Sequence, residues 1–233
     1  RDEGDATDSI PIVLIHGTAA SLHTFNDWTS QLKKDYRVIR MDLPAYGLTG
    51  PFPDRDYSIE NYVDFIVDFL DSLEITKCIL GGNSLGGGIA WNFTYKYPDM
   101  VDKLILIDAS GYASKAKSLP LAFRLAQAPL VKNIFTFITP RLVVKASVEN
   151  VYADKSKISE TLVDRYFELA LREGNRQAFI DKFEAQNDLS AHNNIKLIKH
   201  RTLLLWGEKD LLIPVEAAYK FYHDLPNDTL VIL

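Results

Sequence analysis

The chain has 233 residues, of which 47% are hydrophobic and 24% are charged, and its formal net charge is −5. These values are ordinary for one large α/β domain, or for a core with a small subdomain, and they exclude a disordered chain. Because acidic residues outnumber the scattered lysines and arginines, the composition also excludes a general attraction for nucleic acid.

Six short apolar runs predict the strands of a sheet. Most of them are continuous runs of Val, Ile and Leu, which is typical of strands that are buried on both faces of a parallel sheet. The runs are Ile10–Ile15, Tyr36–Met41, Lys77–Leu80, Lys103–Ile107, Thr202–Trp206 and Thr229–Leu233.

Helical patterns lie between these runs. The clearest is Ser58–Leu73, where Ser58 can cap a helix whose apolar residues recur every three or four positions. A second helix includes Asn92–Tyr97 and ends at Pro98, and a third, Val215–Tyr222, begins after a proline. Strands that alternate with helices predict a right-handed, doubly wound α/β sheet.

The alternation stops at residues 112–199, which contain no clear strand pattern. We expect helices at Leu119–Phe137, Ser159–Arg172 and Gln177–Ala185, and therefore a helical cap over residues 112–199. The core domain would then consist of residues 1–111 and 200–233. The first of these helices is rich in Leu, Ala, Phe and Ile, which fits core packing, the wall of an apolar pocket or a membrane surface.

The chemistry begins at Gly82-Asn83-Ser84-Leu85-Gly86, a G-x-S-x-G sequence between a predicted strand and a predicted helix. A nucleophile on such a sharp turn needs small neighbours that let the strand and helix approach each other. The helix N-terminus adds positive potential where an oxyanion would form. A phosphate-binding loop would require a lysine after the glycines, and none follows.

With this elbow, the chain resembles the α/β-hydrolase superfamily over essentially its whole length. The nearest branch carries a cap and includes esterases, carbon–carbon bond hydrolases and haloperoxidase-like enzymes. The resemblance implies a mostly parallel, doubly wound sheet with a helical cap inserted after the sixth strand of the family's sheet. That sheet has two antiparallel strands before the first run seen here, and only the tail of one fits within Arg1–Asp8. We therefore expect a chain that is truncated at both ends.

Two loops carry the resemblance further. Ile12–Thr18 ends in His16-Gly17-Thr18, which resembles the family's oxyanion loop, so the backbone N–H groups of Thr18 and Leu85 are the expected oxyanion donors. His16 itself is expected to be structural. The segment 41–50 resembles the family's Asp-x-Pro-Gly-x-Gly loop, in which Ala45 stands where glycine is usual and Asp42 would organise the loop.

The family places its catalytic acid after the strand represented here by Thr202–Trp206. Asp210 in Gly207-Glu208-Lys209-Asp210 matches that position, and it would orient and stabilise a catalytic histidine. Asp108, at the end of the preceding predicted strand, is the alternative acid.

The general base is the missing part of the pattern. A serine needs a base within hydrogen-bond reach, and in this family the base is a histidine after the last strand. We expect it beyond Leu233, in a short loop containing Gly-His, so that the fragment itself would be inactive. The five histidines of the chain do not fit this position: His16, His23, His192, His200 and His223.

The favoured function is the hydrolysis of a small, largely apolar ester through an acyl-enzyme intermediate on Ser84. Serine at this position disfavours the alkyl-enzyme chemistry of relatives that use aspartate there. A carbon–carbon bond hydrolase is one alternative, because some of these share Gly-Asn-Ser and bind a substrate carboxylate with a cap arginine. The candidates for that role are Arg124, Arg141, Arg165, Arg172 and Arg176. The same fold could also serve as a non-catalytic ligand receptor, or as a lipase or acyltransferase at a membrane surface.

The expected partner is a small-molecule substrate, without nucleic acid, metal or organic cofactor, because no cluster has metal-ligand spacing. The lone Cys78 is typical of a reducing compartment and favours the cytoplasm. No apolar run reaches the roughly 18 to 20 residues that cross a membrane. Because the chain opens with Arg1, a missing leader or anchor, membrane association and the oligomeric state stay open.

Overall fold

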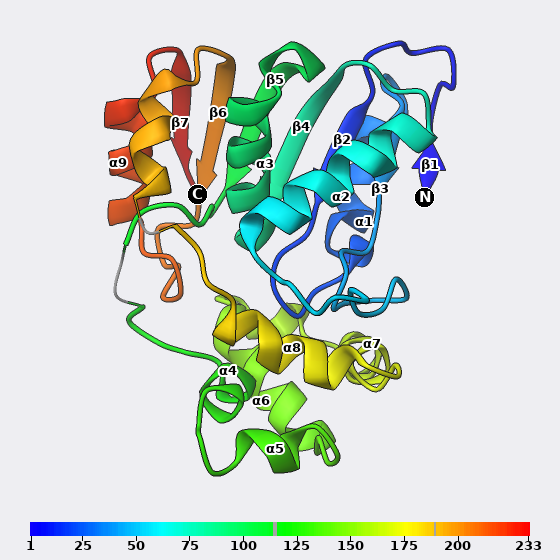
Figure 1. The fold of residues 1–233 in the computed structure, drawn as a ribbon, viewed down its shortest axis with the longest axis vertical. Helices are drawn as coiled ribbons and strands as arrows, with labels where there is room; N and C mark the ends of the chain where they lie inside the picture. The colour runs from blue at the N-terminus through cyan, green and yellow to red at the C-terminus, as the bar shows by residue number, and fades with distance from the viewer. Residues whose placement is uncertain (114–115, 189) are drawn as a thin grey trace.

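A computed structural model describes residues 1–113, 116–188 and 190–233. Within them, seven strands form one sheet in the order β1-β3-β2-β4-β5-β6-β7 (Figure 1). Every neighbouring pair is parallel except β1 against β3. The strands are β1 (Asp2–Glu3), β2 (Ile12–Ile15), β3 (Val38–Arg40), β4 (Cys78–Asn83), β5 (Val101–Ile107), β6 (Arg201–Trp206) and β7 (Asp228–Ile232). All six predicted strands are therefore present, and the predicted mostly parallel sheet is confirmed.

Both faces of the sheet are covered, as the continuous apolar runs indicated. Alternate residues of a strand point to opposite faces, and in β2 Val13 and Ile15 join the larger apolar cluster while Ile12 and Leu14 join a smaller one. Figure 1 shows α2 and α3 across the face that carries the larger cluster. The elements that flank the sheet are η1 (Leu22–Phe25), α1 (Asn26–Leu32), α2 (Ile59–Ser72), α3 (Leu85–Lys96), η2 (Pro98–Met100) and α9 (Glu216–Asp224).

Helix α2 forms where the apolar spacing predicts it. The Ser58 side chain accepts a hydrogen bond from the N–H of Asn61, which satisfies one of the donors left free at a helix start. Its buried face consists of Tyr62, Val63, Ile66 and Leu70. The helix packs against α3, the element that follows Ser84.

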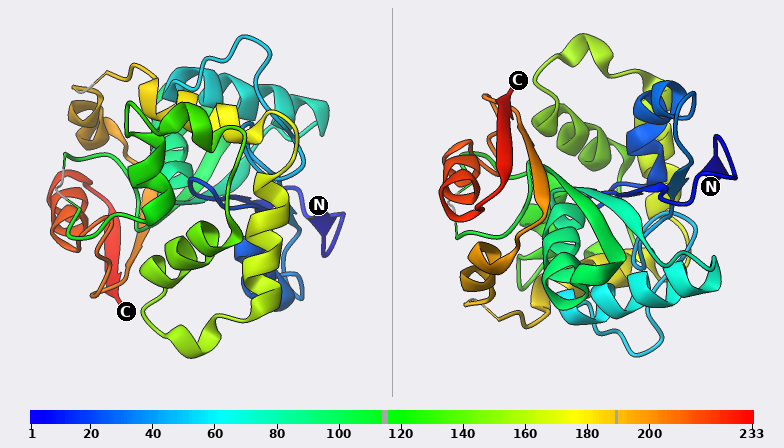
Figure 2. Two further views of the ribbon diagram at one scale, coloured as in Figure 1. Left: turned by 90° about the horizontal axis from the view of Figure 1, so that it is seen from below. Right: turned by 90° about the horizontal axis from the view of Figure 1, so that it is seen from above.

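The segment between β5 and β6 contains helices, and most of them lie below the sheet in Figure 1. Its elements are α4 (Leu121–Ala126), α5 (Lys132–Phe135), α6 (Arg141–Val151), η3 (Lys155–Lys157), α7 (Glu160–Ala170), α8 (Asn175–Glu184) and η4 (Ala191–Leu197). The last of them, η4, packs instead against α3 and α9. Residues 114, 115 and 189 of the expected cap lie outside the described residues. Figure 2, seen from below, shows these helices in front of the ends of the strands.

The expected single helix at Leu119–Phe137 is wrong. The chain forms α4 and α5 instead, with Pro129 between them. Proline lacks an N–H group and its ring clashes with the carbonyl one turn earlier, so a helix does not run through it. Helix α6, for which no prediction was made, begins at Arg141, directly after Pro140.

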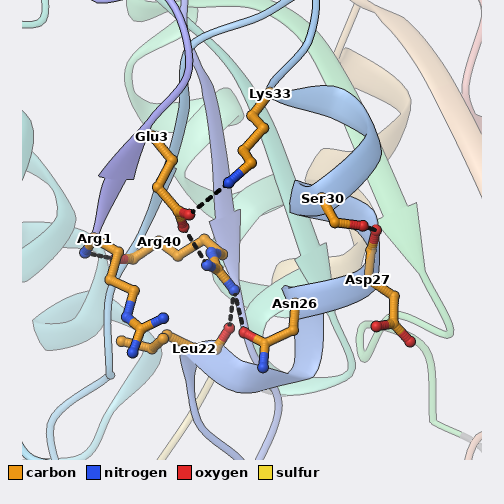
Figure 3. Close-up of polar contacts among 8 residues, drawn as sticks. All are labelled: Arg1, Glu3, Leu22, Asn26, Asp27, Ser30, Lys33 and Arg40. Atoms are coloured by element: carbon orange, nitrogen blue, oxygen red, sulfur yellow. Dashed lines mark hydrogen bonds and ion pairs between the residues drawn. The ribbon is translucent and has the colours of Figure 1, made fainter.

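A buried arginine ties the first strand to the loop after β2 (Figure 3). The guanidinium of Arg40 donates to the carbonyl of Leu22 over 3.1 Å and to the Asn26 side chain over 2.7 Å, and it pairs with Glu3. The N–H of Leu22 donates to Asp42 over 2.8 Å. The far end of the 16–22 loop is therefore held from two sides.

Candidate active site

Ser84 lies between β4 and α3 with φ 53° and ψ −115°. This region of backbone space costs a non-glycine residue about 1–3 kcal/mol, and it persists only where neighbours hold it. The Ser84 N–H donates to the carbonyl of Ile107 over 3.0 Å, and its own carbonyl accepts the N–H groups of Gly88 and Ser110, each over 3.0 Å. The strained turn is therefore held by hydrogen bonds to the next strand and to the loop after it.

Glycine is required on both sides of Ser84 because backbone segments of the elbow and of β2 lie in direct contact there. A Cβ atom on Gly82 would lie 2.1 Å from the carbonyl oxygen of Gly86, and one on Gly86 would lie 2.1 Å from that of Ile15. No side chain fits at either position. Helix α3 begins at Leu85, directly after the serine.

The loop after β2 packs directly against Ser84. A Cβ atom on Gly17 would lie 3.1 Å from the Ser84 Cβ, and the next residue, Thr18, lines the same cavity as Ser84. On the other side, Leu85 is the first residue of α3, where an N–H group has no acceptor within its own helix. The two residues expected to supply oxyanion donors therefore flank the serine.

His16 holds this loop through hydrogen bonds at both of its ring nitrogens. Its Nδ1–H donates to the carbonyl of Gly17 over 2.8 Å, and its Nε2 accepts the N–H of Leu43 over 2.9 Å. This pair of bonds requires the neutral ring, and full burial lowers the pKa of His16 to about 4. Both ring nitrogens are occupied, so His16 has no nitrogen left for the Ser84 hydroxyl.

The loop at residues 42–50 is organised by a carboxylate. One oxygen of Asp42 accepts the N–H of Leu22 over 2.8 Å, and the other accepts that of Leu48 over 2.9 Å. A Cβ atom on Gly47 would lie 2.1 Å from Asp42, so glycine is required there. Ala45 has φ 82°, which explains why the family prefers glycine at this position.

Asp108 and Asp210 share one wall of the cavity. Asp108 accepts the N–H of Gly207 over 2.8 Å. Oδ1 of Asp210 accepts the N–H groups of the second and third residues after it, over 2.7 and 2.9 Å. Burial raises the pKa of Asp108 to about 6, with a contribution from the neighbouring Asp210. Burial also raises the pKa of Asp210, against the effect of its two backbone donors. The two acids named from the sequence are therefore neighbours with perturbed pKa values.

A cavity of about 800 Å³ lies between the sheet and the helical segment that follows β5. Ser84 and Thr18 line its floor, and the helical segment contributes aromatic and aliphatic side chains, among them Phe123, Phe135 and Phe179. A volume of this size is typical of small-molecule sites, which are mostly apolar with a few convergent polar groups.

The five candidate arginines have different surroundings. Arg165 and Arg176 line the cavity, and Arg124, Arg141 and Arg172 do not. Arg141 pairs with two carboxylates, and Arg176 donates to the carbonyl of Phe137 over 2.8 Å. Within residues 1–113, 116–188 and 190–233, Arg165 is half-buried and has no ion pair or side-chain hydrogen bond.

Asn175 is a cavity residue that the sequence analysis missed. It is buried, and its amide nitrogen donates to the carbonyls of Gly47 over 3.0 Å and Leu169 over 2.9 Å. It therefore links the helical segment to the loop at residues 42–50, while its Oδ1 has no partner among the described residues. No local pattern marks an asparagine for this role, because its partners lie 128 and 6 residues away along the chain.

The remaining histidines do not line the cavity that contains Ser84. None of the described residues that line the cavity is a histidine. His200, for example, donates from Nε2 to the carbonyl of Pro98 over 2.9 Å, and His192 packs on the ring of Tyr112. Among the described residues, no three His, Cys, Asp or Glu side chains are grouped to hold a metal ion, and no helix is long and apolar enough to cross a membrane.

The chain is similar to known hydrolases in both sequence and fold. The chain is 26% identical over 231 residues to an uncharacterised hydrolase of Bacillus subtilis, YugF, covering 95% of this chain and 81% of the relative. It is 28% identical over 220 residues to the 2-hydroxy-6-oxo-2,4-heptadienoate hydrolase of Pseudomonas putida, covering 90% and 75%. The structure of a thermophilic esterase from Thermogutta terrifontis matches all of this chain and 83% of its own with a TM-score of 0.80 at 21% identity, which shows the shared fold.

The model of the alpha/beta hydrolase fold family matches residues 10–233, which is nearly the whole chain. In this chain Ser84 follows β4, Asp108 follows β5 and Asp210 follows β6. These three strands are parallel neighbours, so the three residues lie at the same end of the sheet, the carboxyl end of its strands. The chain therefore belongs to the α/β hydrolase fold family.

Proposed function

We propose that the protein is a serine hydrolase that cleaves a small, largely apolar ester through an acyl-enzyme intermediate on Ser84. The observation that carries this proposal is the strained backbone of Ser84, φ 53°, at the floor of an 800 Å³ cavity. Strain of this kind is retained at sites where it aims a reactive group.

In the first half of the reaction, Ser84 Oγ bonds to the ester carbonyl carbon while a base takes the hydroxyl proton. The carbonyl oxygen becomes negative, and the N–H groups of Thr18 and Leu85 stabilise it. The carbon–oxygen bond to the alcohol then breaks, and the base returns the proton to the leaving alkoxide. Water repeats the sequence on the acyl-enzyme and releases the acid.

Asp210 is the proposed orienting acid. Its Oδ1 is occupied by two backbone donors, which leaves Oδ2 for the N–H of an imidazole. We infer that the base is a histidine following Leu233. Leu233 exchanges backbone hydrogen bonds of 2.8 and 2.9 Å with Trp206 and Glu208, so its backbone runs beside the turn that carries Asp210. The histidines within the described residues do not line the cavity, which supports this assignment.

Residues 112–199 are the proposed cap, and the core is residues 1–111 and 200–233. The aromatic side chains that α4, α5 and α8 direct into the cavity favour an apolar acyl or alcohol group. Asn175 and its bonds to Gly47 and Leu169 would hold the cap in register with the loop below it.

The test is covalent labelling of the full-length protein with a fluorophosphonate. We expect rapid labelling that is lost in Ser84→Ala and retained in Ser30→Ala, an exposed serine on α1. Hydrolysis of a panel of esters with graded chain length then identifies the acyl preference. A Ser84 that stays unlabelled while the cavity binds a ligand would contradict the proposal and favour a non-catalytic receptor.

A second candidate is carbon–carbon bond hydrolysis, which the cavity arginine favours. Arg165 is a half-buried guanidinium without an ion pair in the described part of the chain, and guanidinium groups bind carboxylates well. The Pseudomonas putida relative is named for a dienoate, a substrate that carries a carboxylate. Turnover of such an acid at a higher kcat/KM than any neutral ester would favour this candidate.

A further inference from the structure

One face of the helical segment exposes an unusual number of large apolar side chains. Its members, which we call the apolar cap face, are Leu130, Ile134, Phe137, Ile138 and Leu142, with exposed fractions of 91%, 60%, 79%, 64% and 75%. Each of the five has at least 60% of its surface exposed. Large apolar side chains that are exposed together on one part of a protein mark an interaction site.

The spacing explains why most of these side chains share a face. Residues 128–138 follow helical hydrogen bonds, including Lys132 N–H to Ala128 and Ile138 N–H to Ile134. Positions 130, 134, 137 and 138 therefore project in one direction. The opposite side of the same segment carries Phe135 and Thr139, which are buried and line the cavity. The segment is apolar towards the cavity and apolar towards the outside, which is the pattern of a helix with apolar surroundings on both sides.

The stretch of chain that carries this face contains basic residues and no acidic ones. Residues 109–148 contain no Asp or Glu, although the whole chain is acidic. In the described part of that stretch the basic residues are Lys117, Arg124, Lys132, Arg141 and Lys145. Several of them pair with acids from other elements, as Lys132 does with Glu184 and Lys145 with Glu160. Arg124 is exposed and has no ion pair in residues 1–113, 116–188 and 190–233.

The position of the apolar cap face favours a lipid surface as its partner. In Figure 1, α5 lies at the end of the molecule farthest from the sheet, so the face is on a protruding tip. A fluid lipid surface accommodates such a tip, whereas a protein partner would need a matching hollow. Apolar side chains flanked by lysine and arginine are also the composition that binds anionic headgroups and inserts below them.

We propose that the apolar cap face inserts into the headgroup region of a lipid bilayer that contains anionic lipid. Ile134, Phe137 and Ile138 enter the boundary between headgroups and acyl chains, and Arg124 contacts the phosphates. This wall of the cavity then lies near the membrane surface, because Phe135 and Thr139 of the same segment form part of it. This inference concerns where the protein binds and is independent of the reaction at Ser84.

The test is flotation of the purified protein with vesicles of phosphatidylcholine, alone or with one third phosphatidylglycerol. We expect binding to both, stronger with phosphatidylglycerol, and a decrease of that extra binding as salt rises. The triple variant Ile134→Ser, Phe137→Ser and Ile138→Ser should lower the partition coefficient at least about tenfold, because three exposed apolar side chains are lost. Leu197→Ser, an exposed leucine on η4, is the matched control and should bind like the parent.

Parent and variant are also compared by circular dichroism and by size-exclusion chromatography. Equal binding of parent and triple variant, with the variant folded, overturns the proposal, as does a parent that floats with neither kind of vesicle. A parent that is dimeric and a variant that is monomeric, without vesicle binding, overturns it in favour of a second copy of the chain. Labelling of Ser84 by a fluorophosphonate reports on the reaction separately.

Discussion

The sheet and the helical segment contribute different kinds of groups to the same cavity. On the sheet side, backbone hydrogen bonds hold the groups in place: they fix the turn at Ser84, and backbone N–H groups donate to the carboxylates of Asp108 and Asp210. The helical side acts through side chains, of which Phe123, Phe179 and Arg165 are examples. Under the proposed function, the core would determine which bond is attacked, and the helices would determine which molecule is admitted.

The largest expected effect is a loss of kcat when a carboxylate of the core is changed. Asp210→Asn should lower kcat by about 10³- to 10⁴-fold, because an orienting acid that becomes an amide no longer stabilises the imidazolium. Asp108→Asn keeps an oxygen for the Gly207 N–H and should change kcat by less than about fivefold. Steady-state kinetics of the full-length protein measure both. A larger loss in Asp108→Asn would reassign the acid to that residue.

The next largest effect is on KM and tests whether the helical segment selects the substrate. Arg165→Gln should raise KM about 10- to 100-fold for a substrate with a carboxylate, because a charged hydrogen bond is lost, and should leave neutral esters nearly unchanged. Arg124→Gln, on α4 and outside the cavity, is the control. Equal losses with charged and neutral substrates would mean that Arg165 only supports the fold.

A smaller effect concerns stability against pH. The pKa of Asp108 is raised from 3.8 to about 6, so the folded protein holds this proton more tightly than the unfolded chain does. The resulting stabilisation is complete below pH 3.8 and is lost as the pH rises to about 6. Asp108→Asn lacks this contribution, so its stability relative to the parent should increase by about 2–3 kcal/mol between about pH 4 and pH 7.

Urea unfolding at several pH values checks this expectation. Asp99→Asn, an exposed carboxyl on η2, is the control and should follow the parent across the range. A difference between Asp108→Asn and the parent that does not vary with pH would contradict the assigned shift.

The smallest effect is at Ala45. Because Ala45 has φ 82°, Ala45→Gly should relieve strain and raise the free energy of unfolding by about 0.5–1 kcal/mol. Ala90→Gly, the same change inside α3, should lower it by a similar amount or more. Thermal unfolding of both variants measures the two signs, and a destabilised Ala45→Gly would contradict the strain assigned to this loop.

The two regions also differ in how well local sequence predicts them. The strands and α2 were predicted to within a few residues, because a buried strand or an amphipathic helix repeats its pattern over a short window. The helical segment was predicted less well: one expected helix breaks at Pro129, and α6 was not named. Several of its helices have only four to seven residues, so each shows too few turns of apolar spacing to be recognised in a short window.

The sequence alone determined the elbow and the order of the chemical groups, because glycines around a serine and an aspartate after a buried strand are local signals. Only the tertiary structure decided that His16 has both nitrogens occupied, that Arg165 rather than Arg124 or Arg141 lines the cavity, and that Asn175 contacts Gly47. The reason is physical. A side chain's partner, burial and pKa depend on residues that are distant along the chain, and only the packed fold brings those residues together.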